Sequence, residues 1–401
     1  MTQHGGCAAR SLLWQRRCGH RNEMTMILTE TSAHRWRFNG LEFWPKFRRW
    51  TVELATVLGD GLNKGKFWTD AWSLVEGCTP VSPGCANCWL AGMENRFHGQ
   101  TRGNDQGDKR ILTKEGKFSG LVFSREDRLS FPLKKRNPRV YAIWSDLFHG
   151  EVSDIFQDQA IAVMGAAQRH HFIIVTKRPE VAVAYFESRE FRKKDGANWP
   201  NVTILVTMED QQRADERAPY AMQLAAQGWR VGALCEPLLG PVDLTRIYQH
   251  GTTEGGGSWG SWESALNGKT PDIWGGGPDI EGGPRLSWVI TGGESGASAR
   301  PVHPDWVRSL RDQAQAAGIP FMFKQWGEWA PYDGGPEVDD DPEQTKFLTM
   351  EWREDQWEDV GYPGWSDFAD YVDSNHCTAR VGKRKAGRSL DGREWLELPA
   401  T

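Results

Sequence analysis

The chain has 401 residues, of which 39% are hydrophobic and 25% charged, and this composition excludes an intrinsically disordered protein. Its formal net charge is −5, so the whole chain lacks the basic character of a nucleic-acid-binding polycation. No apolar stretch approaches the roughly 20 residues of a membrane span, and the start of the chain lacks the apolar core of a secretory signal. We therefore expect a cytoplasmic protein that does not span a membrane.

Composition divides the chain into three regions. Residues 1–60 are rich in arginine and lack helix or strand periodicity, so we expect an N-terminal extension that is partly mobile. Residues 61–330 have the pattern of a folded domain, interrupted at 245–285 by a segment rich in Gly, Ser and Trp that we expect to be a surface insertion. Residues 331–401 are expected to form a C-terminal appendage that packs on this domain.

Within the central region, short apolar runs rich in β-branched residues alternate with segments long enough for helices. The hydrophobic periodicity predicts helices over 155–169, 214–227 and 305–317, the last ending at Gly318. Such alternation is typical of parallel βα units, so we expect an α/β fold with a parallel (β/α) barrel. Six runs are the expected strands, namely 140–143, 172–175, 202–206, 231–234, 288–290 and 321–323.

Polar residues follow each of these runs. In a parallel barrel the carboxyl ends of the strands share one rim, where ligands bind. A single polar residue after a strand marks only where that strand leaves the core, whereas six in succession indicate a rim. The rim residues are Ser145, Asp146, Thr176, Lys177, Arg178, Glu209, Asp210, Glu236, the turn from Gly292 to Gly296, Lys324 and Gln325.

The strongest chemical signal is a group of three cysteines within eleven residues, Cys78, Cys85 and Cys88, in a C-x6-C-x2-C arrangement. The chain has seven cysteines, an odd number, and this clustering indicates a metal site rather than disulfides. Two metals suit the spacing. One is zinc, with a fourth ligand such as His98 closing a tetrahedron. The other is an iron–sulfur cluster with three protein ligands and one iron open to a further ligand.

The motifs around this loop and along the rim resemble a family of phage-associated three-cysteine-motif proteins of uncharacterised function, which look like divergent members of the radical S-adenosylmethionine superfamily. The resemblance covers about residues 67–399 and leaves the N-terminal extension and the Gly-rich insertion outside it. It rests on Trp68-Thr69-Asp70, Val81 to Cys85, Ser145 to His149, Thr176 to Pro179, Glu236 to Pro241, Gly292 to Gly296, Lys324 to Gly327, Ala386 to Arg388 and Leu390 to Arg393.

The resemblance implies a partial, six-unit barrel in which Cys78, Cys85 and Cys88 hold a 4Fe-4S cluster. The open iron of such a cluster binds the amino and carboxylate groups of S-adenosylmethionine. An electron from an external donor then cleaves this cofactor to a 5′-deoxyadenosyl radical, which abstracts hydrogen from a substrate. The phage association suggests a nucleobase, in DNA or as a nucleotide precursor, modified in a bacterial host cell.

The sequence departs from the common superfamily pattern in two ways. The first cysteine gap has six residues where three are usual, and the Gly292-Gly293-Glu294 turn lies about 200 residues after the cysteines instead of soon after them. We assign cofactor binding to rim residues with backbone amides, hydroxyls or carboxylates, namely Ser145, Glu236, Gly292, Gly293, Glu294 and Ser295. The candidate catalytic residues are Asp146, Lys177, Glu209 and Lys324.

Two other functions fit parts of the sequence. A zinc-stabilised nucleic-acid-binding or adaptor protein would use the cysteines structurally and bind phosphates through a basic C-terminal stripe, made of Lys383, Arg384, Lys385, Arg388 and Arg393. A metal-dependent hydrolase would use Asp146, His149 and Glu209, but one isolated histidine fits such a site poorly.

Overall fold

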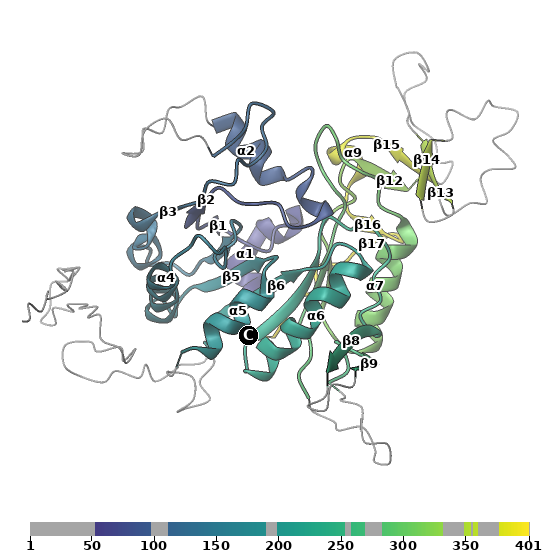
Figure 1. The fold of residues 1–401 in the computed structure, drawn as a ribbon. Helices are drawn as coiled ribbons and strands as arrows, with labels where there is room; N and C mark the ends of the chain where they lie inside the picture. The colour runs from purple at the N-terminus through teal and green to yellow at the C-terminus, as the bar shows by residue number, and fades with distance from the viewer. Residues whose placement is uncertain are drawn as a thin grey trace, which may run out of the picture.

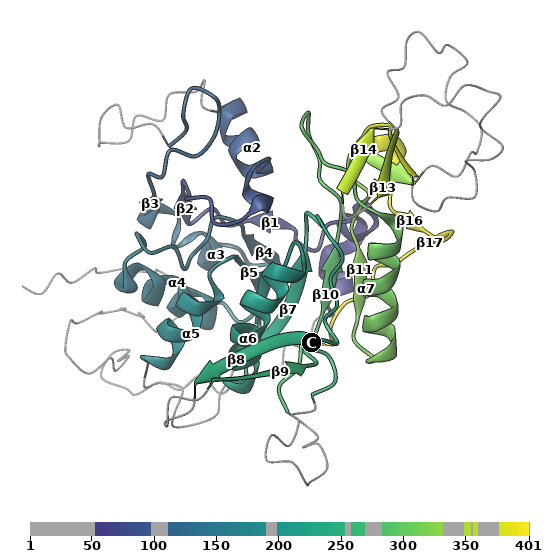
Figure 2. The same ribbon diagram turned by 45° about the vertical axis from the view of Figure 1, so that its right-hand side comes forward.

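The computed structural model describes residues 53–97, 111–189, 199–252, 258–268, 283–331, 349–353, 356–359 and 377–400. At its centre lies a seven-stranded sheet in which every pair of neighbouring strands is parallel. The strands follow one another in chain order, and the sheet curls into a half-barrel (Figure 1, Figure 2). They are β1 (Asp70–Ala71), β4 (Val140–Ile143), β5 (His171–Thr176), β6 (Val202–Thr207), β7 (Arg230–Cys235), β10 (Val289–Thr291) and β11 (Phe321–Phe323).

This arrangement confirms the expected α/β fold with a parallel sheet. Each of the six predicted runs forms a strand. The sheet has one more strand than expected because β1 pairs with β4 through only two residues, Asp70 and Ala71. Two residues are too few for a hydrophobic pattern, and the sequence therefore did not reveal this strand.

Four helices cover the outer face of the sheet: α4 (Asp154–Ala166), α5 (Pro179–Glu187), α6 (Gln211–Ala226) and α7 (Pro304–Ala316) (Figure 1). Three of them confirm the helices predicted over 155–169, 214–227 and 305–317, and their N-caps are Ser153, Asp210 and His303. Gly318 has a φ of +63° and ends α7 as expected. Helix α5 was not predicted, although its proline at the first turn is a common start signal.

The two faces of the sheet are buried in different ways. On the outer face, side chains such as Phe172 and Ile204 pack against the helices. On the inner face, alternate residues such as Ile173 and Leu205 pack with the short helix α1 (Leu54–Leu58) and with Leu396 and Leu398 near the C-terminus. Both ends of the described chain therefore help to fill the inside of the half-barrel.

Smaller elements lie around this core. The range 245–285 contains a hairpin of β8 (Ile247–Thr252) and β9 (Ser258–Glu263). A four-stranded antiparallel sheet follows β11, in the order β12 (Trp329–Pro331), β15 (Cys377–Arg380), β13 (Thr349–Arg353) and β14 (Gln356–Asp359). The remaining short elements are η1 (Gly59–Lys64), β2 (Val75–Glu76), η2 (Pro83–Cys85), α2 (Trp89–Phe97), β3 (Phe123–Ser124), η3 (Glu126–Arg128), α3 (Phe131–Lys134), α9 (Lys383–Ala386), β16 (Ser389–Leu390) and β17 (Arg393–Glu394).

Some sequence-based expectations fall on residues that the structure does not describe, namely residues 1–52, His98 and parts of the Gly-rich insertion and of the C-terminal appendage. Where helices are described, none has both the length and the apolar character needed to cross a membrane.

Candidate metal and cofactor site

The three cysteines lie on one loop, which leaves β2 and enters α2; we call residues 77–88 the cysteine loop. Two glycines fix its path. Gly77 has a φ of +86°, and a Cβ atom there would lie 1.8 Å from the carbonyl oxygen of Leu121. A Cβ atom on Gly84 would lie 2.5 Å from a carboxylate oxygen of Glu209. The loop thus approaches the rim of the sheet more closely than any larger residue would allow.

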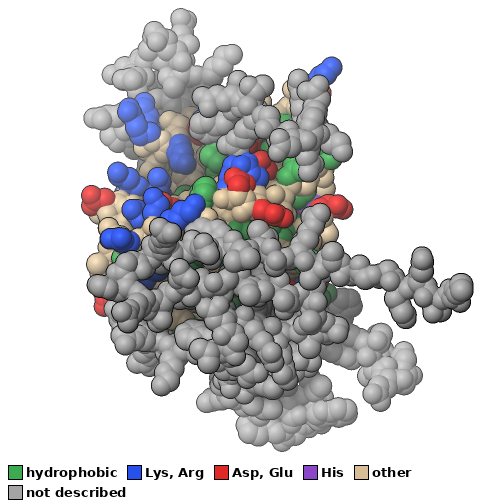
Figure 3. Space-filling model, turned by 90° about the vertical axis from the view of Figure 1, so that its left-hand side faces the viewer, with side chains coloured by type: hydrophobic (Ala, Val, Ile, Leu, Met, Phe, Trp, Pro, Cys, Tyr) green, Lys and Arg blue, Asp and Glu red, His purple; other side chains and the backbone are tan. Residues whose placement is uncertain are grey.

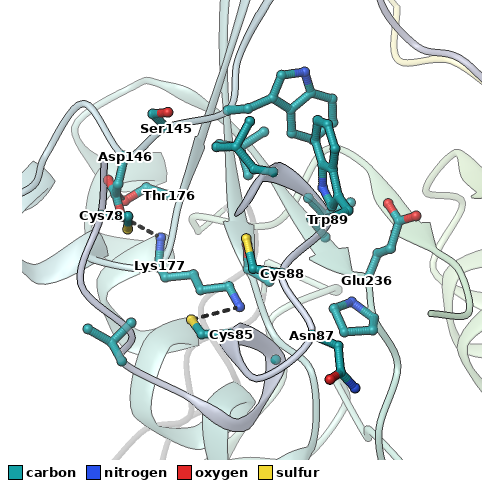
Figure 4. Close-up of a pocket in the computed structure, with 18 of the residues that line it drawn as sticks. Cys78, Cys85, Asn87, Cys88, Trp89, Ser145, Asp146, Thr176, Lys177 and Glu236 are labelled. Carbon is teal, nitrogen blue, oxygen red and sulfur yellow. Dashed lines mark hydrogen bonds between the residues drawn. The ribbon is translucent and has the colours of Figure 1, made fainter. Parts of the chain in front are cut away.

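The cysteine loop covers a pocket at the carboxyl ends of the strands, with a cavity of about 140 Å³. Inner-face residues Val175 and Leu234 form part of its wall. Figure 4 shows the three cysteines around the same space, with the Lys177 side chain reaching toward Cys85. Of the residues assigned a metal-binding, cofactor-binding or catalytic role from sequence, those that line this pocket are Cys78, Cys85, Cys88, Ser145, Asp146, Lys177, Glu236, Gly293, Glu294 and Ser295, whereas Glu209, Gly292 and Lys324 are not among its lining residues.

Arg178 anchors the first part of the cysteine loop. Its guanidinium forms an ion pair with Asp146 at 3.0 Å, and both side chains are buried. It also donates to the backbone and side-chain oxygens of Thr79 at 2.9 and 2.8 Å and lies 4.0 Å from the Cys78 sulfur. Asp146 in turn accepts from Thr176 Oγ1 and from the Lys177 amide. Residues that follow β4 and β5 therefore fix the position of the cysteine loop at Cys78 and Thr79.

Lys177 and Glu209 anchor the middle of the loop. The Lys177 ammonium lies 2.5 Å from Glu209, 3.3 Å from Ser82 Oγ and 3.7 Å from the Cys85 sulfur. Ser82 also donates to Glu209. Glu209 is fully buried and binds a second cation, Arg217 of α6, at 2.7 Å. Burial acts to raise the pKa of Glu209, but the two cations outweigh it and keep this pKa below its ordinary value.

Glu294 anchors the last part of the loop. Its carboxylate accepts from Asn87 Nδ2 at 3.0 Å and from the Arg300 side chain at 2.6 and 2.9 Å. Asn87 also donates to the carbonyl oxygen of Ser298. The turn after β10 thus holds the residue beside Cys88. A Cβ atom on Gly293 would lie 1.9 Å from the carbonyl oxygen of Trp326, so this glycine is required by close packing of the backbone.

Glu236 and Lys324 form an ion pair at the opposite side of the pocket. The Lys324 ammonium also lies 5.3 Å from the ring centres of Phe67 and Trp68, and 5.7 Å from that of Trp144. Cation–π contacts of this kind hold the ammonium in place. Lys324 is therefore not a lining residue of the pocket but forms an ion pair with one, Glu236. Glu209 is related to the lining residue Lys177 in the same way. Gly292 lies next to Glu236, since a Cβ atom there would be 3.3 Å from its carboxylate.

Three tryptophan side chains in contact with one another form an aromatic wall beside the cysteine loop. Trp89 directly follows Cys88, is 45% exposed and makes an edge-to-face contact with Trp144 at 5.3 Å; both line the pocket. Trp144 contacts Trp68, which continues the wall inward. Large aromatic side chains at a pocket mouth exclude water and offer a face to a planar ligand.

The three thiols differ in their surroundings. Burial raises the pKa of Cys78 to about 11 and also raises that of Cys88. Burial acts in the same direction on Cys85, but the Lys177 ammonium and hydrogen bonds from the loop outweigh it and lower this pKa. A soft metal centre binds thiolates, so its binding would release protons from the buried thiols.

His149 contacts Asp146 through the backbone, where its amide donates to the Asp146 carbonyl oxygen at 3.2 Å, and no side-chain hydrogen bond joins the two among the described residues. Its Nδ1 accepts from the Glu151 amide at 3.1 Å, and its Nε2 lies 2.7 Å from Thr79 Oγ1. Burial lowers the pKa of His149, which favours the neutral ring in this structural role. Across the described part of the chain, no three His, Cys, Asp or Glu side chains converge closely enough to hold a single metal ion. Of the residues that a hydrolase would use, Asp146 and Glu209 are each paired with cations instead, and His149 contacts Thr79.

Several residues of the site were not recognised from the sequence. Arg217 lies in the middle of α6, and Asn87 and Arg300 lie in loops, where polar residues are common. Only Trp89 has a sequence signal that we overlooked, because it directly follows the third cysteine.

Comparison with known proteins places the chain in a family without assigning an activity. No curated protein matches the chain, and no solved structure matches it. Residues 64–399 match a family described as "Protein of unknown function (DUF5131)", and this match covers the cysteine loop, the half-barrel and the C-terminal elements. The chain therefore belongs to the DUF5131 family.

Proposed function

We propose that this protein is a radical S-adenosylmethionine-type enzyme in which Cys78, Cys85 and Cys88 hold a 4Fe-4S cluster. One observation carries the proposal. Three thiols on a loop between the first two strands of a parallel, curled sheet, β1 and β4, line a single pocket at the carboxyl ends of its strands. Thiolates are the usual ligands of iron–sulfur clusters, and this end of a parallel sheet is where ligands bind.

The donor set fits such a cluster better than a closed zinc site. The ligands of one zinc ion must meet around one point, whereas each thiolate of a cluster binds a different iron. Each carboxylate that lines the pocket already has a cationic partner: Asp146 pairs with Arg178, Glu236 with Lys324, and Glu294 with Arg300. This pairing disfavours a fourth protein ligand and suits an iron left open for S-adenosylmethionine.

The charges around the thiols support the same proposal. Lys177, Arg217 and Glu209 form a partly buried group with one surplus positive charge beside Cys85. Arg178 lies near Cys78. A cluster bound by thiolates is anionic, and cations at this distance in a partly buried site stabilise an anion.

When bound, the cluster and S-adenosylmethionine supply an electron and a carbon radical that abstracts hydrogen. The chain itself would orient these groups and shield them from water. Ser145, Ser295 and Glu236 line the pocket and offer hydroxyl and carboxylate groups to the cofactor. Trp89 and Trp144 would cover a planar substrate, and we propose that this substrate is a nucleobase, in DNA or as a nucleotide precursor. An external protein would supply the electron.

The test is anaerobic purification followed by reconstitution with iron and sulfide. We expect a brown protein with about four irons per chain, whose reduced electron paramagnetic resonance signal changes when S-adenosylmethionine is added. A variant with Cys85→Ala and Cys88→Ala is expected to lose both the colour and the signal.

The matched control is Cys235→Ala. Cys235 is fully buried at the end of β7 and does not line the pocket, so this variant should keep the iron. A colourless protein that holds one zinc at Cys78, Cys85 and Cys88 would refute the proposal and favour a zinc-stabilised binding protein. Iron retained by the double variant would also refute it.

A further inference from the structure

A second functional surface lies away from the cysteine pocket, on the loop that leads into β4. We call residues 131–139 the cationic loop; they comprise α3 and the segment before Val140. Lys134, Lys135 and Arg136 are consecutive and exposed. Figure 3, which views the side of the molecule with β3 and α4, shows Lys and Arg side chains gathered toward one edge of that face.

The backbone of the cationic loop is held rigidly. Arg169 donates to the carbonyl oxygens of Lys135 and Leu133 at 2.7 and 3.0 Å. The buried His170 accepts from the Arg139 amide through Nδ1, so its Nε2 proton is free to donate to the carbonyl oxygen of Pro132 at 2.9 Å. The three cations are therefore displayed at defined positions by a fixed loop.

These cations are not neutralised by the described part of the protein. No ion pair joins Lys134, Lys135 or Arg136 to an acidic residue among the described residues. Three neighbouring like charges on a rigid loop repel one another, and a polyanion relieves that repulsion. In the C-terminal basic stripe, Arg388 pairs with Glu394 at 2.9 Å and Arg393 lies 3.8 Å from Glu397. Its other cations, Lys383, Arg384 and Lys385, have no such pair among the described residues, but they lack an aromatic residue close to them in the sequence.

An exposed aromatic ring completes the surface. Phe131 is 45% exposed, and the Lys134 ammonium lies 5.5 Å from its ring centre. An aromatic face beside a row of cations is the combination with which proteins bind single-stranded nucleic acids, because unpaired bases stack on the ring while the cations contact phosphates. Bases within a duplex are already stacked and do not offer this contact.

We propose that the cationic loop binds the backbone of a single-stranded nucleic acid, with Lys134, Lys135 and Arg136 contacting phosphates and Phe131 stacking on a base. This inference stands independently of the iron–sulfur proposal, because it uses none of the residues of the pocket. The net charge of the chain is −5, so an anionic strand is attracted to this local surface rather than to the protein as a whole.

The test is fluorescence anisotropy of the full chain with a labelled 20-nucleotide oligothymidylate over a range of salt concentrations. Three phosphate contacts predict a slope of about −2 in a plot of log affinity against log salt, which is about a 20-fold loss between 50 and 200 mM. The triple variant Lys134→Ala, Lys135→Ala and Arg136→Ala should bind on the order of 10-fold more weakly at 50 mM, with a slope near zero.

The matched control replaces the three consecutive cations of α9, with Lys383→Ala, Arg384→Ala and Lys385→Ala, and should retain both affinity and slope. Replacing Lys134 and Lys135 by Arg should preserve binding, which separates loss of charge from loss of folding. Phe131→Ala should weaken binding of the single strand and leave binding of a duplex of equal length unchanged.

Three results would overturn the proposal. The first is equal binding by the intact chain and the triple variant at the cationic loop. The second is an equal loss in the α9 control. The third is binding to vesicles of phosphatidylserine and phosphatidylcholine with none to the oligonucleotide. Because the assay measures neither iron nor catalysis, its failure leaves the iron–sulfur proposal untouched.

Discussion

The buried ion pair between Asp146 and Arg178 anchors the cysteine loop, and its contribution to the free energy of unfolding can be measured directly. Their side chains are 7% and 9% exposed, respectively. Asp146→Ala leaves the Arg178 guanidinium buried, with Thr79 and the Cys78 sulfur as its remaining partners. Removing one member of a buried ion pair costs about 3–5 kcal/mol, and we expect the free energy of unfolding to fall by this amount.

The reciprocal change should cost less. In Arg178→Met the Asp146 carboxylate keeps three donors, namely Thr176 Oγ1 at 2.8 Å, the Lys177 amide at 3.0 Å and the Phe148 amide at 3.2 Å. We expect a loss of about 1–3 kcal/mol, because a carboxylate with three hydrogen bonds remains partly compensated. The double variant should lose less than the sum of the two, by about 1–3 kcal/mol.

Urea unfolding of the metal-free protein, followed by circular dichroism, measures all three variants. Asp312→Ala is the control, because Asp312 is 66% exposed and its ion pair with Arg311 should contribute no more than about 1 kcal/mol. The reasoning is wrong if the two single losses add to the double loss within about 0.5 kcal/mol, or if Asp146→Ala costs no more than the control.

Two further predictions concern packing and pH. Gly84→Ala should reduce the iron bound after reconstitution, because the new Cβ would lie 2.5 Å from Glu209 and 2.9 Å from the Lys177 ammonium. The control Gly92→Ala in α2 should keep the iron, because its new Cβ would have no atom within 4 Å. Equal amounts of iron in the two variants would contradict this prediction. Burial lowers the pKa of His171 to about 3 from an ordinary value of 6.5, so the unfolded chain takes up a proton below about pH 6.5 while the folded chain does not. The free energy of unfolding should therefore fall as pH drops from 6.5 toward 3, and this group contributes at most about 1.4 kcal/mol per pH unit to the fall. In urea unfolding measured over this pH range, His171→Asn should lack the contribution of this group. An unchanged slope of the unfolding free energy against pH in this variant would contradict the assignment.

The local sequence pattern determined much of the fold. Runs of β-branched residues bounded by polar ones predicted six of the seven strands of the central sheet, and the 3.6-residue period predicted three of the helices that cover it. The cysteine loop was equally visible, because its three thiols are close in sequence and the pattern needs no tertiary contact. These features share one cause, since a strand, a helix or a short metal loop is specified mainly by neighbouring residues.

The partners of the rim residues were decided only by the tertiary structure. Polar residues after strands predicted a rim, but not that Asn87 meets Glu294 across 207 residues or that Arg178 meets Thr79 across 99. These contacts depend on the order and curl of the strands, which bring distant loops to one edge of the sheet. The candidate catalytic residues Asp146, Lys177 and Glu209 were recognised by chemical type, whereas their ion pairs and contacts with the cysteine loop required knowing which long side chains reach it. Residue type and periodicity are local properties, but the pairing of charges depends on distances that only the folded chain sets.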